Sequence, residues 1–259
     1  MASDDYSSEM ILSHLTTREV GRNLIYRLIV NSTMDVALEQ MALGAPHGTT
    51  VVAETQELGK GRLDRRWISP KGGVYLSIIL YPPVQYLNSL TMITSLAVCD
   101  CIKEVCGLKA TIKWPNDVLV GGKKVSGILA TSGASPSKGT YAIVGIGINV
   151  DMDLKEHTEI AGSSTNLAAS SSRKISRQAV LCALLENFEK RYEKAASGES
   201  QVGEWSEAMV TLGQKVTVKT GNKTFTGVAE SVDNEGNLVL RLANGELKVI
   251  PAGDVTLRV

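Results

Sequence analysis

The sequence has few of the residues that mark several large classes of protein. Only four cysteines and three histidines occur among its 259 residues, aromatic residues make up 5%, and 27 acidic side chains balance 27 basic ones. A zero net charge provides no global field to draw the chain onto nucleic acid or an anionic membrane. No apolar run reaches the length of a membrane span, and the first residues lack the layout of a secretory signal. We therefore expect a cytoplasmic protein without membrane contact.

The cysteines and histidines do not form a metal-binding pattern. Cys99, Cys101 and Cys106 lie within one apolar helical pattern, and Cys182 lies in another. No histidine stands at ligand spacing from them, so we expect buried, reduced thiols rather than a zinc site. The histidines themselves are scattered along the chain, and none is a candidate catalytic base.

The hydrophobic pattern predicts an α+β fold with a catalytic domain at residues 1–210. Helices are expected at residues 34–43, 89–105 and 175–196, and a serine-rich connector at 163–172. Strands are expected at residues 23–30, 49–54, 73–80, 110–114, 124–131 and 141–150. This succession favours a mixed or antiparallel sheet covered by helices.

From residue 213 the pattern changes to short strands separated by turn signals. Asn-Gly and related turn residues separate strands expected at residues 216–220, 224–232, 237–242, 247–250 and 255–259. Five strands in so short a stretch predict a small β-barrel at 211–259, an appended module rather than a second large domain.

The most informative segment is a glycine-rich basic loop between Gly59 and Trp67. Four cations lie within it: Lys60, Arg62, Arg65 and Arg66. Glycines allow backbone N–H groups to approach phosphate oxygens, and guanidinium groups make forked hydrogen bonds to oxyanions. The tryptophan offers a flat surface that can cover a ring. Taken alone, such a string is more typical of a solvated basic loop whose end is anchored by the tryptophan.

Four further segments carry candidate binding residues, although each has an ordinary structural explanation. Ser32 and Thr33 stand at a helix start, where capping explains their hydroxyls as well as ligand binding does. Residues 113–117 (Lys-Trp-Pro-Asn-Asp) end a strand in a turn, and residues 121–129 carry two lysines into a strand. The glycines of residues 145–150 leave room for a ligand or another backbone, but the rest of a dinucleotide fingerprint is absent.

The combination and order of these segments closely resemble the biotin–protein ligases. The order is Ser-Thr, then Gln-x-x-Gly-x-Gly-Arg-x-x-Arg-x-Trp, Lys-Trp-Pro-Asn-Asp, Lys-x-x-Gly-Ile-Leu and Gly-Ile-Gly-Ile-Asn-Val, over about residues 23–150. The resemblance implies a mixed sheet with helices, related to class II aminoacyl-tRNA synthetases and lipoate ligases. It also implies an SH3-like β-barrel at the C-terminus, in agreement with the strands expected there.

The resemblance further implies a two-step reaction. Biotin and ATP, with Mg²⁺, give biotinyl-5′-AMP and pyrophosphate, and a lysine of a biotin carboxyl carrier protein then accepts the biotinyl group. Because the biotin carboxylate must attack a phosphate that is itself negative, the site must first neutralise clustered charge. The cations expected to do so are Arg62, Arg65, Lys113 and Lys124. Asp117 is expected to receive or orient the acceptor lysine.

Roles for the other motif residues also follow from the resemblance. The residues expected to contact biotin are Ser32, Thr33, Gln56, Lys60, Gly61, Arg62, Lys124, Gly127 and Gly145. The residues expected to serve ATP and the adenylate are Arg65, Trp67, Asn116 and Asn149. Three positions depart from the family pattern: Met34 stands for Asn, Lys60 for Arg and Asp64 for Gly. A literal Ser-Thr-Asn at residues 164–166 is interpreted as part of the connector.

Family resemblance favours a homodimer. Some family members carry an N-terminal DNA-binding domain, but only 31 residues precede Ser32, so no regulation through DNA is expected. Two alternatives remain open: lipoate ligation on a related fold, and a non-catalytic sensor of biotin or nucleotide. The intact cations Arg62, Lys113 and Lys124 argue against the sensor.

Overall fold

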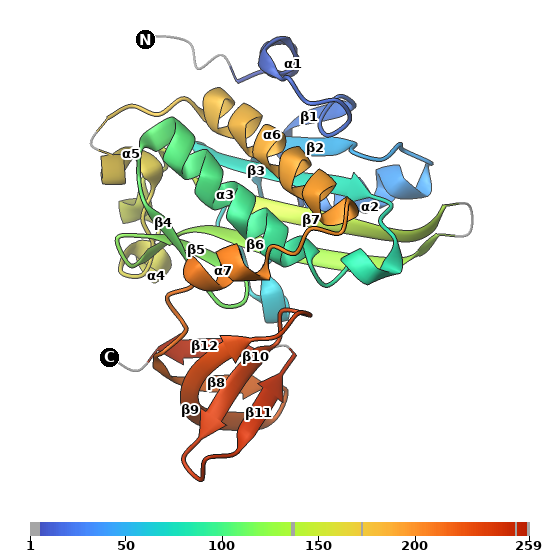
Figure 1. The fold of residues 1–259 in the computed structure, drawn as a ribbon. Helices are drawn as coiled ribbons and strands as arrows, with labels where there is room; N and C mark the ends of the chain where they lie inside the picture. The colour runs from blue at the N-terminus through green and yellow to red at the C-terminus, as the bar shows by residue number, and fades with distance from the viewer. Residues whose placement is uncertain (1–5, 136–137, 172, 252, 258–259) are drawn as a thin grey trace.

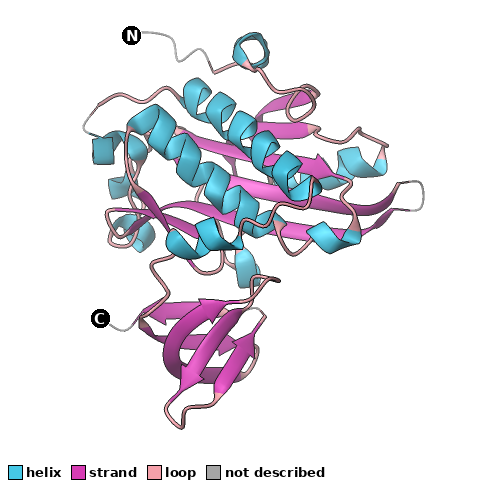
Figure 2. Ribbon diagram, viewed as in Figure 1, coloured by secondary structure: helices cyan, strands magenta, loops and turns pink. Residues whose placement is uncertain are grey.

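Two β-sheets organise the chain, one of seven strands and one of five (Figures 1 and 2). The structure is a computed structural model that describes residues 6–135, 138–171, 173–251 and 253–257. Within these residues, no helix combines the length and the apolar character needed to cross a membrane.

The larger sheet has the strand order β1-β2-β3-β7-β6-β5-β4. Its strands are β1 (Leu24–Val30), β2 (Thr50–Gln56), β3 (Gly73–Leu80), β4 (Ala110–Lys113), β5 (Asp117–Val120), β6 (Lys123–Ser135) and β7 (Gly139–Asn149). Strands β1 and β2 are parallel and the other neighbours are antiparallel, so the predicted mixed sheet is confirmed. Strand β3 is buried along its whole length because helices cover both faces at the centre of the sheet.

Helices cover the two faces of this sheet unequally. The α-helices are α1 (Ser8–His14), α2 (Thr33–Ala42), α3 (Leu90–Cys106), α4 (Thr158–Ala161), α5 (Leu167–Ser171), α6 (Arg177–Ala196) and α7 (Val202–Glu207). Helices α3 and α6 lie side by side over one face (Figure 1), where they form the main core. Helix α2 packs on the other face against Val51, Ile79 and Ile143. Successive strand residues therefore serve opposite cores, as the pleat requires.

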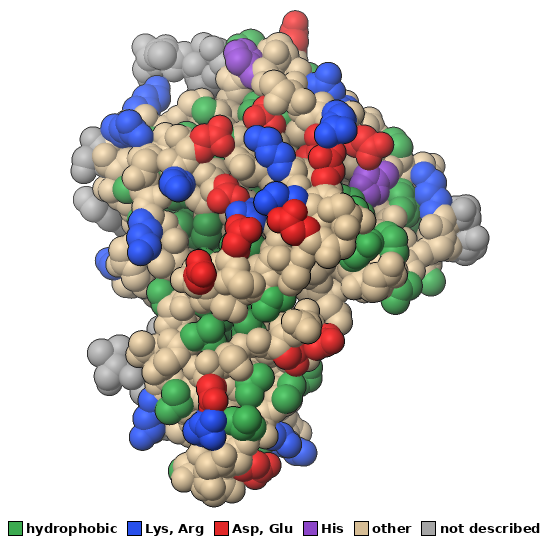
Figure 3. Space-filling view, viewed as in Figure 1, with side chains coloured by type: hydrophobic (Ala, Val, Ile, Leu, Met, Phe, Trp, Pro, Cys, Tyr) green, Lys and Arg blue, Asp and Glu red, His purple; other side chains and the backbone are tan. Residues whose placement is uncertain are grey.

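The surface over α3 and α6 carries charges of both signs in close alternation (Figure 3). Arg191 of α6 illustrates the arrangement, because it pairs with Asp100 of α3 at 2.6 Å and with Glu204 of α7 at 3.0 Å. Three of the four thiols expected to be buried are so: Cys101, Cys106 and Cys182 are buried and free, whereas Cys99 is free but only partly buried. Burial raises the pKa of Cys182 to about 11, so this thiol is a poor nucleophile at neutral pH.

The structure corrects several boundaries of the predicted elements. The segment interpreted as an Asn-Asp turn leads directly into β5, and β6 and β7 extend to residues 135 and 139, beyond the predicted 124–131 and 141–150. The serine-rich connector contains α5, although residue 172 lies outside the described residues. Helices α1, α4 and α7 were not predicted. Helices of four to seven residues complete too few turns to show a helical period in the sequence.

The C-terminal sheet is antiparallel, with the strand order β11-β10-β9-β8-β12. Its strands are β8 (Lys215–Thr220), β9 (Lys223–Val232), β10 (Leu238–Leu242), β11 (Leu247–Ile250) and β12 (Asp254–Leu257). All five predicted strands are present, and residues 258–259 of the last lie outside the described residues. Gly221 and Gly245 occupy hairpin turns with φ of 53° and 85°, a conformation that favours glycine.

Trp114 holds the C-terminal sheet against the larger one. Its backbone N–H donates to Thr211 Oγ1 at 2.9 Å, and its indole Nε1 donates to the carbonyl of Gly236 at 3.0 Å. The side chain is almost fully buried, so both bonds are shielded from water. This attachment brings β12 next to the basic loop, where Asp254 contributes to the site described below.

Candidate active site

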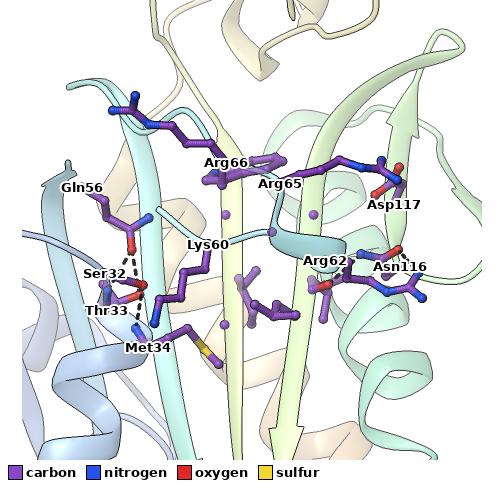
Figure 4. A pocket seen from close by; sticks show the side chains of 18 of the residues that line it. Ser32, Thr33, Met34, Gln56, Lys60, Arg62, Arg65, Arg66, Asn116 and Asp117 are labelled. Atoms are coloured by element: carbon purple, nitrogen blue, oxygen red, sulfur yellow. Dashed lines mark hydrogen bonds between the residues drawn. The ribbon is translucent and has the colours of Figure 1, made fainter. Parts of the chain in front are cut away.

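A cavity of about 110 Å³ opens where the basic loop crosses the larger sheet (Figure 4). Thirteen of the candidate residues line it: Ser32, Thr33, Gln56, Lys60, Gly61, Arg62, Arg65, Trp67, Asn116, Asp117, Lys124, Gly127 and Gly145. They come from the start of α2, the end of β2, the basic loop and strands β5, β6 and β7. The structure thus brings residues from all five sequence motifs to one cavity, although Lys113 of the third motif and Asn149 of the fifth do not line it.

One end of the cavity is an ordered set of neutral polar groups at the start of α2. Ser32 is the N-cap and accepts a hydrogen bond from the backbone N–H of Met34 at 3.3 Å. Gln56 Oε1 accepts from the backbone N–H of Thr33 at 2.8 Å and from its hydroxyl at 3.1 Å. Ser77 Oγ, fully buried on β3, donates to the Thr33 hydroxyl at 2.8 Å. This end suits a small ring that both donates and accepts hydrogen bonds.

The opposite side of the cavity carries Arg62 next to Asn116 (Figure 4), whereas Lys60 lies near Ser32 and Thr33. Arg62 Nη1 donates to Asn116 Oδ1 at 3.1 Å, and Lys124 Nζ pairs with Asp117 Oδ1 at 2.6 Å. Burial lowers the pKa of Arg62, the nearby Asp117 raises it, and Arg65 lowers it. The guanidinium still carries its charge at neutral pH because its ordinary pKa lies so far above 7. This side therefore suits an anion.

The basic loop is anchored by ion pairs to elements on both sides of it. Lys60 pairs with Asp35 in the first turn of α2, and Arg65 pairs with Asp254 of β12. Within the loop, the N–H of Gly61 donates to the carbonyl of Arg65 at 2.7 Å, so this N–H is not directed at the cavity. The expectation that loop glycines offer N–H groups to phosphate is thus not met at Gly61.

Two consecutive residues at the tip of this loop adopt left-handed backbone conformations. Leu63 has φ of 54° and Asp64 has φ of 56°, and these are the positive-φ residues other than glycine in the described chain. Asp64 stands where the family has glycine, and aspartate tolerates this conformation better than most residues. Leucine does not, so the strain in this turn is concentrated at Leu63.

Glycines in β6 and β7 make room for two large side chains rather than for a ligand alone. A Cβ atom on Gly147 would lie 2.2 Å from Trp67 Nε1, and one on Gly127 would lie 2.9 Å from the same indole. A Cβ atom on Gly145 would lie 2.6 Å from the sulfur of Met34. The strand glycines therefore seat Trp67 and Met34 directly on the sheet. The strand glycines predict room for a ligand or another backbone, whereas two side chains occupy this space in the structure.

A second cavity of about 640 Å³ lies on the other side of Trp67 and Lys124. Lys113 and Asn149 line this cavity and not the first one, so the structure separates them from the other candidates. Asn149 is nearly buried, and its Nδ2 donates to the carbonyl of Thr165 at 3.0 Å. The Ser-Thr-Asn segment interpreted as connector therefore lies against the site, and Ser164 lines the second cavity.

Sequence reasoning missed other residues that line the two cavities. Arg66 lies in the basic loop but was given no role, whereas Asp254 and Thr256 come from β12. No local signal marks the β12 residues, because their proximity to the loop arises from the attachment of the C-terminal sheet. Among the described residues, no group of three or more His, Cys, Asp or Glu side chains is placed to hold a metal ion.

The fold and the site together define a protein of the biotin and lipoate ligase class. Residues 25–149 match the Biotin/lipoate A/B protein ligase family, and residues 211–258 match the Biotin protein ligase C terminal domain. The chain belongs to this family, and its motifs and relatives place it among the biotin–protein ligases.

Curated relatives and solved structures agree with this placement. The chain is 37% identical over 249 residues to the bifunctional ligase/repressor BirA of Bacillus subtilis, covering 94% of this chain and 76% of that protein. It is 30% identical over 233 residues to the biotin--[acetyl-CoA-carboxylase] ligase of Paracoccus denitrificans, covering 87% and 96%. The structure of biotin protein ligase from Aquifex aeolicus in complex with biotin and ATP is similar, with a TM-score of 0.78, 31% identity and coverage of 92% and 99%.

Proposed function

We propose that this protein is an ATP-dependent biotin–protein ligase. It activates biotin as biotinyl-5′-AMP and transfers the biotinyl group to a lysine of a biotin carboxyl carrier protein. Relatives from Paracoccus denitrificans and Mycobacterium tuberculosis are biotin--[acetyl-CoA-carboxylase] ligases, which act on such a carrier. The observation that carries the proposal is the cavity itself, with the polar groups of Ser32, Thr33 and Gln56 at α2 and with Arg62 and Lys124 on the opposite side.

The cavity fits biotin with its ring toward α2 and its carboxylate toward the cations. In this arrangement Ser32, Thr33 and Gln56 meet the ureido group, which carries both N–H donors and a carbonyl acceptor. The backbone at Gly61, Gly127 and Gly145, with Lys60, completes the lining. In this arrangement Arg62 and Lys124 meet the carboxylate, and the contact of Lys124 with both cavities supports a role for it between the two reactants.

ATP fits the second, larger cavity on the far side of Trp67. Arg65 and Lys113 line this cavity and supply positive charge for the phosphates, and Asn149 lies at its wall. Asn116, which was expected to serve the nucleotide, lines the first cavity instead and accepts a hydrogen bond from Arg62 there. We include Mg²⁺ because it accompanies substrate phosphates in most nucleotide-dependent enzymes. Removal of Mg²⁺ by a chelator should abolish adenylate formation, and undiminished activity would contradict its inclusion.

Biotin is expected to stabilise the protein against heat, whereas lipoate is not. The dithiolane ring of lipoate has no N–H or carbonyl to match Ser32, Thr33 and Gln56. These groups would then give up hydrogen bonds to water without gaining hydrogen bonds to the ligand. At 100 times the dissociation constant, a ligand stabilises by about 2.7 kcal/mol, or about 5–10 °C in a chain of this size. Thermal unfolding with each acid, added separately, measures the difference. Equal stabilisation by lipoate would favour lipoate ligation.

A transfer assay separates the ligase from a non-catalytic sensor. The protein is incubated with labelled biotin, ATP, Mg²⁺ and a biotin carboxyl carrier domain, and the label on the carrier is counted. Biotin-dependent stabilisation without any label on the carrier would identify a sensor. Cell fractionation would test the cytoplasmic location that belongs to this proposal.

We also propose that residues 1–210 form the catalytic domain and residues 211–259 an SH3-like barrel. The five strands β8 to β12 pair only with one another, which supports a separate module. Limited proteolysis should yield a stable fragment that ends or begins near residue 210. Cleavage confined to the strands themselves would contradict this division.

The free edge of the larger sheet supports a homodimer. Strand β1 forms one of the two edges of this sheet, and it exposes two large apolar side chains, Leu28 at 69% and Ile29 at 65%. An open edge with exposed apolar residues is a natural site for pairing with a second copy. Leu28→Lys is expected to convert a dimer to a monomer in analytical ultracentrifugation, whereas Leu43→Lys, at a site 80% exposed after α2, should not. A monomeric parent protein would contradict the dimer.

A further inference from the structure

Ser69 lies directly behind the polar end of the biotin cavity without lining it. It follows the basic loop, is 5% exposed, and its carbonyl accepts a hydrogen bond from the backbone N–H of Gln56 at 3.1 Å. Its hydroxyl accepts from Gln56 Nε2 at 2.8 Å and donates to the carbonyl of Trp67 at 3.1 Å. The family motifs assigned no role to this residue.

These bonds form a chain whose direction cannot be reversed. At one end, the backbone N–H of Thr33 can only donate, so it requires the oxygen of the Gln56 amide. At the other end, the carbonyl of Trp67 can only accept, so it takes the single hydroxyl proton of Ser69. The Ser69 oxygen can then only accept a hydrogen bond from Gln56. Its partner must therefore be the amide nitrogen of Gln56. The two backbone groups together fix which way the Gln56 amide points.

The orientation of this amide matters because its two ends have nearly the same size and shape. A flipped amide would fit the same space. It would, however, turn its nitrogen toward the N–H of Thr33, so that a donor would stand where an acceptor is needed. Since Gln56 lines the cavity, the flip would change the hydrogen-bonding pattern that the ligand ring meets. The ring of biotin, with fixed N–H and carbonyl positions, matches one orientation only.

The same chain reaches the base of the basic loop. A Cβ atom on Gly59 would lie 2.4 Å from the Trp67 carbonyl, 2.7 Å from Ser69 Oγ and 3.1 Å from Gln56 Nε2. The backbone N–H of Trp67 donates to the carbonyl of Gly59 at 2.8 Å, which closes the loop at this point. Ring recognition and the closed base of the loop thus share one set of hydrogen bonds.

We propose that Ser69 is a positioning residue that holds the Gln56 amide in one orientation and thereby sets the specificity for the ureido ring. This inference rests on the proposed function. It adds a residue that determines ring specificity although it does not line the cavity. Ser69 acts through Gln56, so its effect is confined to ring recognition and leaves the transfer step untouched.

The test compares Ser69→Ala with the parent protein in the adenylation half-reaction, with biotin and with 2-iminobiotin. In 2-iminobiotin an imino group replaces the ring carbonyl oxygen, which alters the pattern that a fixed amide distinguishes. We expect Ser69→Ala to raise KM for biotin about tenfold and to lower the preference for biotin over 2-iminobiotin at least fivefold, as loss of one buried hydrogen bond allows. The rate of transfer from preformed adenylate should not change.

Three variants distinguish positioning from general structural damage. Ser69→Thr keeps the hydroxyl and should retain the preference. Ser126→Ala removes another buried hydroxyl, one without a partner among the described residues, and should leave both substrates unaffected. In a Gln56→Met background, Ser69→Ala should have no further effect, because the residue it positions is gone.

The outcomes separate this inference from the proposed function. If the parent protein does not activate biotin, the proposed function and the inference both fail. If the parent protein activates biotin but Ser69→Ala keeps its preference, only the inference fails. An effect of Ser69→Ala that persists in the Gln56→Met background would also overturn it. Thermal unfolding of each variant confirms that the comparison is made between folded proteins.

Discussion

Replacing Lys124 by alanine is expected to lower the rate of biotinyl-5′-AMP formation about 100- to 1,000-fold, the usual cost of removing one charge-stabilising donor from a reacting centre. Lys124 lines both cavities, and its ammonium group lies 5.2 Å from the centre of the Trp67 ring that separates them. No other lysine of the motifs occupies this boundary, since Lys113 lines only the second cavity. The measurement is biotin-dependent exchange of labelled pyrophosphate into ATP.

The matched control for this prediction is Lys103→Ala, which removes an exposed lysine of α3 far from both cavities. Lys124→Arg should recover part of the rate because it keeps the charge but changes its shape and position. Exchange at the parent rate in Lys124→Ala would remove this residue from the chemistry and leave Arg62 as the main cation of the biotin cavity.

The cations of the site differ in the partners that they hold in the structure. Lys60 pairs with Asp35, Lys124 with Asp117 and Arg65 with Asp254, whereas Arg62 donates to the neutral amide of Asn116. A ligand anion that binds the first three must compete with a carboxylate. Arg62 has no such ion pair among the described residues, so under the proposed function we expect it to make the first contact with the biotin carboxylate.

The sequence was informative wherever a signal is local. The period of the apolar residues defined β3, α3 and α6 because each is long and faces a core. The four residues of β5 could not be distinguished from the turn before them, since a strand of that length shows no alternation. The short helices α1, α4 and α7 were not predicted for the same reason, because they are too short to show a helical period.

For the site, the motifs identified the residues that line the biotin cavity but not the contacts that orient them. The position of Asp254 beside Arg65 depends on how Trp114 and Gly236 attach the C-terminal sheet. The bond between Ser69 and Gln56 depends on how the chain returns after the basic loop. Glycines in a strand indicate that another group approaches the backbone closely. The sequence does not show whether that group is a ligand or the side chain of Trp67.

Replacing Asp117 by asparagine is expected to lower the transfer of biotin to the carrier about 100-fold, while adenylate formation falls less than about tenfold. The acceptor lysine is an ammonium ion near neutral pH and must lose a proton before it attacks the anhydride, and a positioned general base contributes about 100- to 10,000-fold. Asparagine keeps the size and one oxygen of the side chain but cannot take up the proton. The two half-reactions are timed separately, with preformed adenylate supplied for the transfer step.

The contact between Asp117 and Lys124 makes the comparison of the two half-reactions decisive. Their ion pair, at 2.6 Å, means that Asp117→Asn also removes the carboxylate partner of the lysine proposed for the first step. If Asp117 served only to hold Lys124, both half-reactions would slow together, or adenylation would slow more. Asp35→Asn, which removes the partner of Lys60 instead, is the matched control and should leave transfer at the parent rate. Transfer at the parent rate in Asp117→Asn would assign the deprotonation of the acceptor to another group.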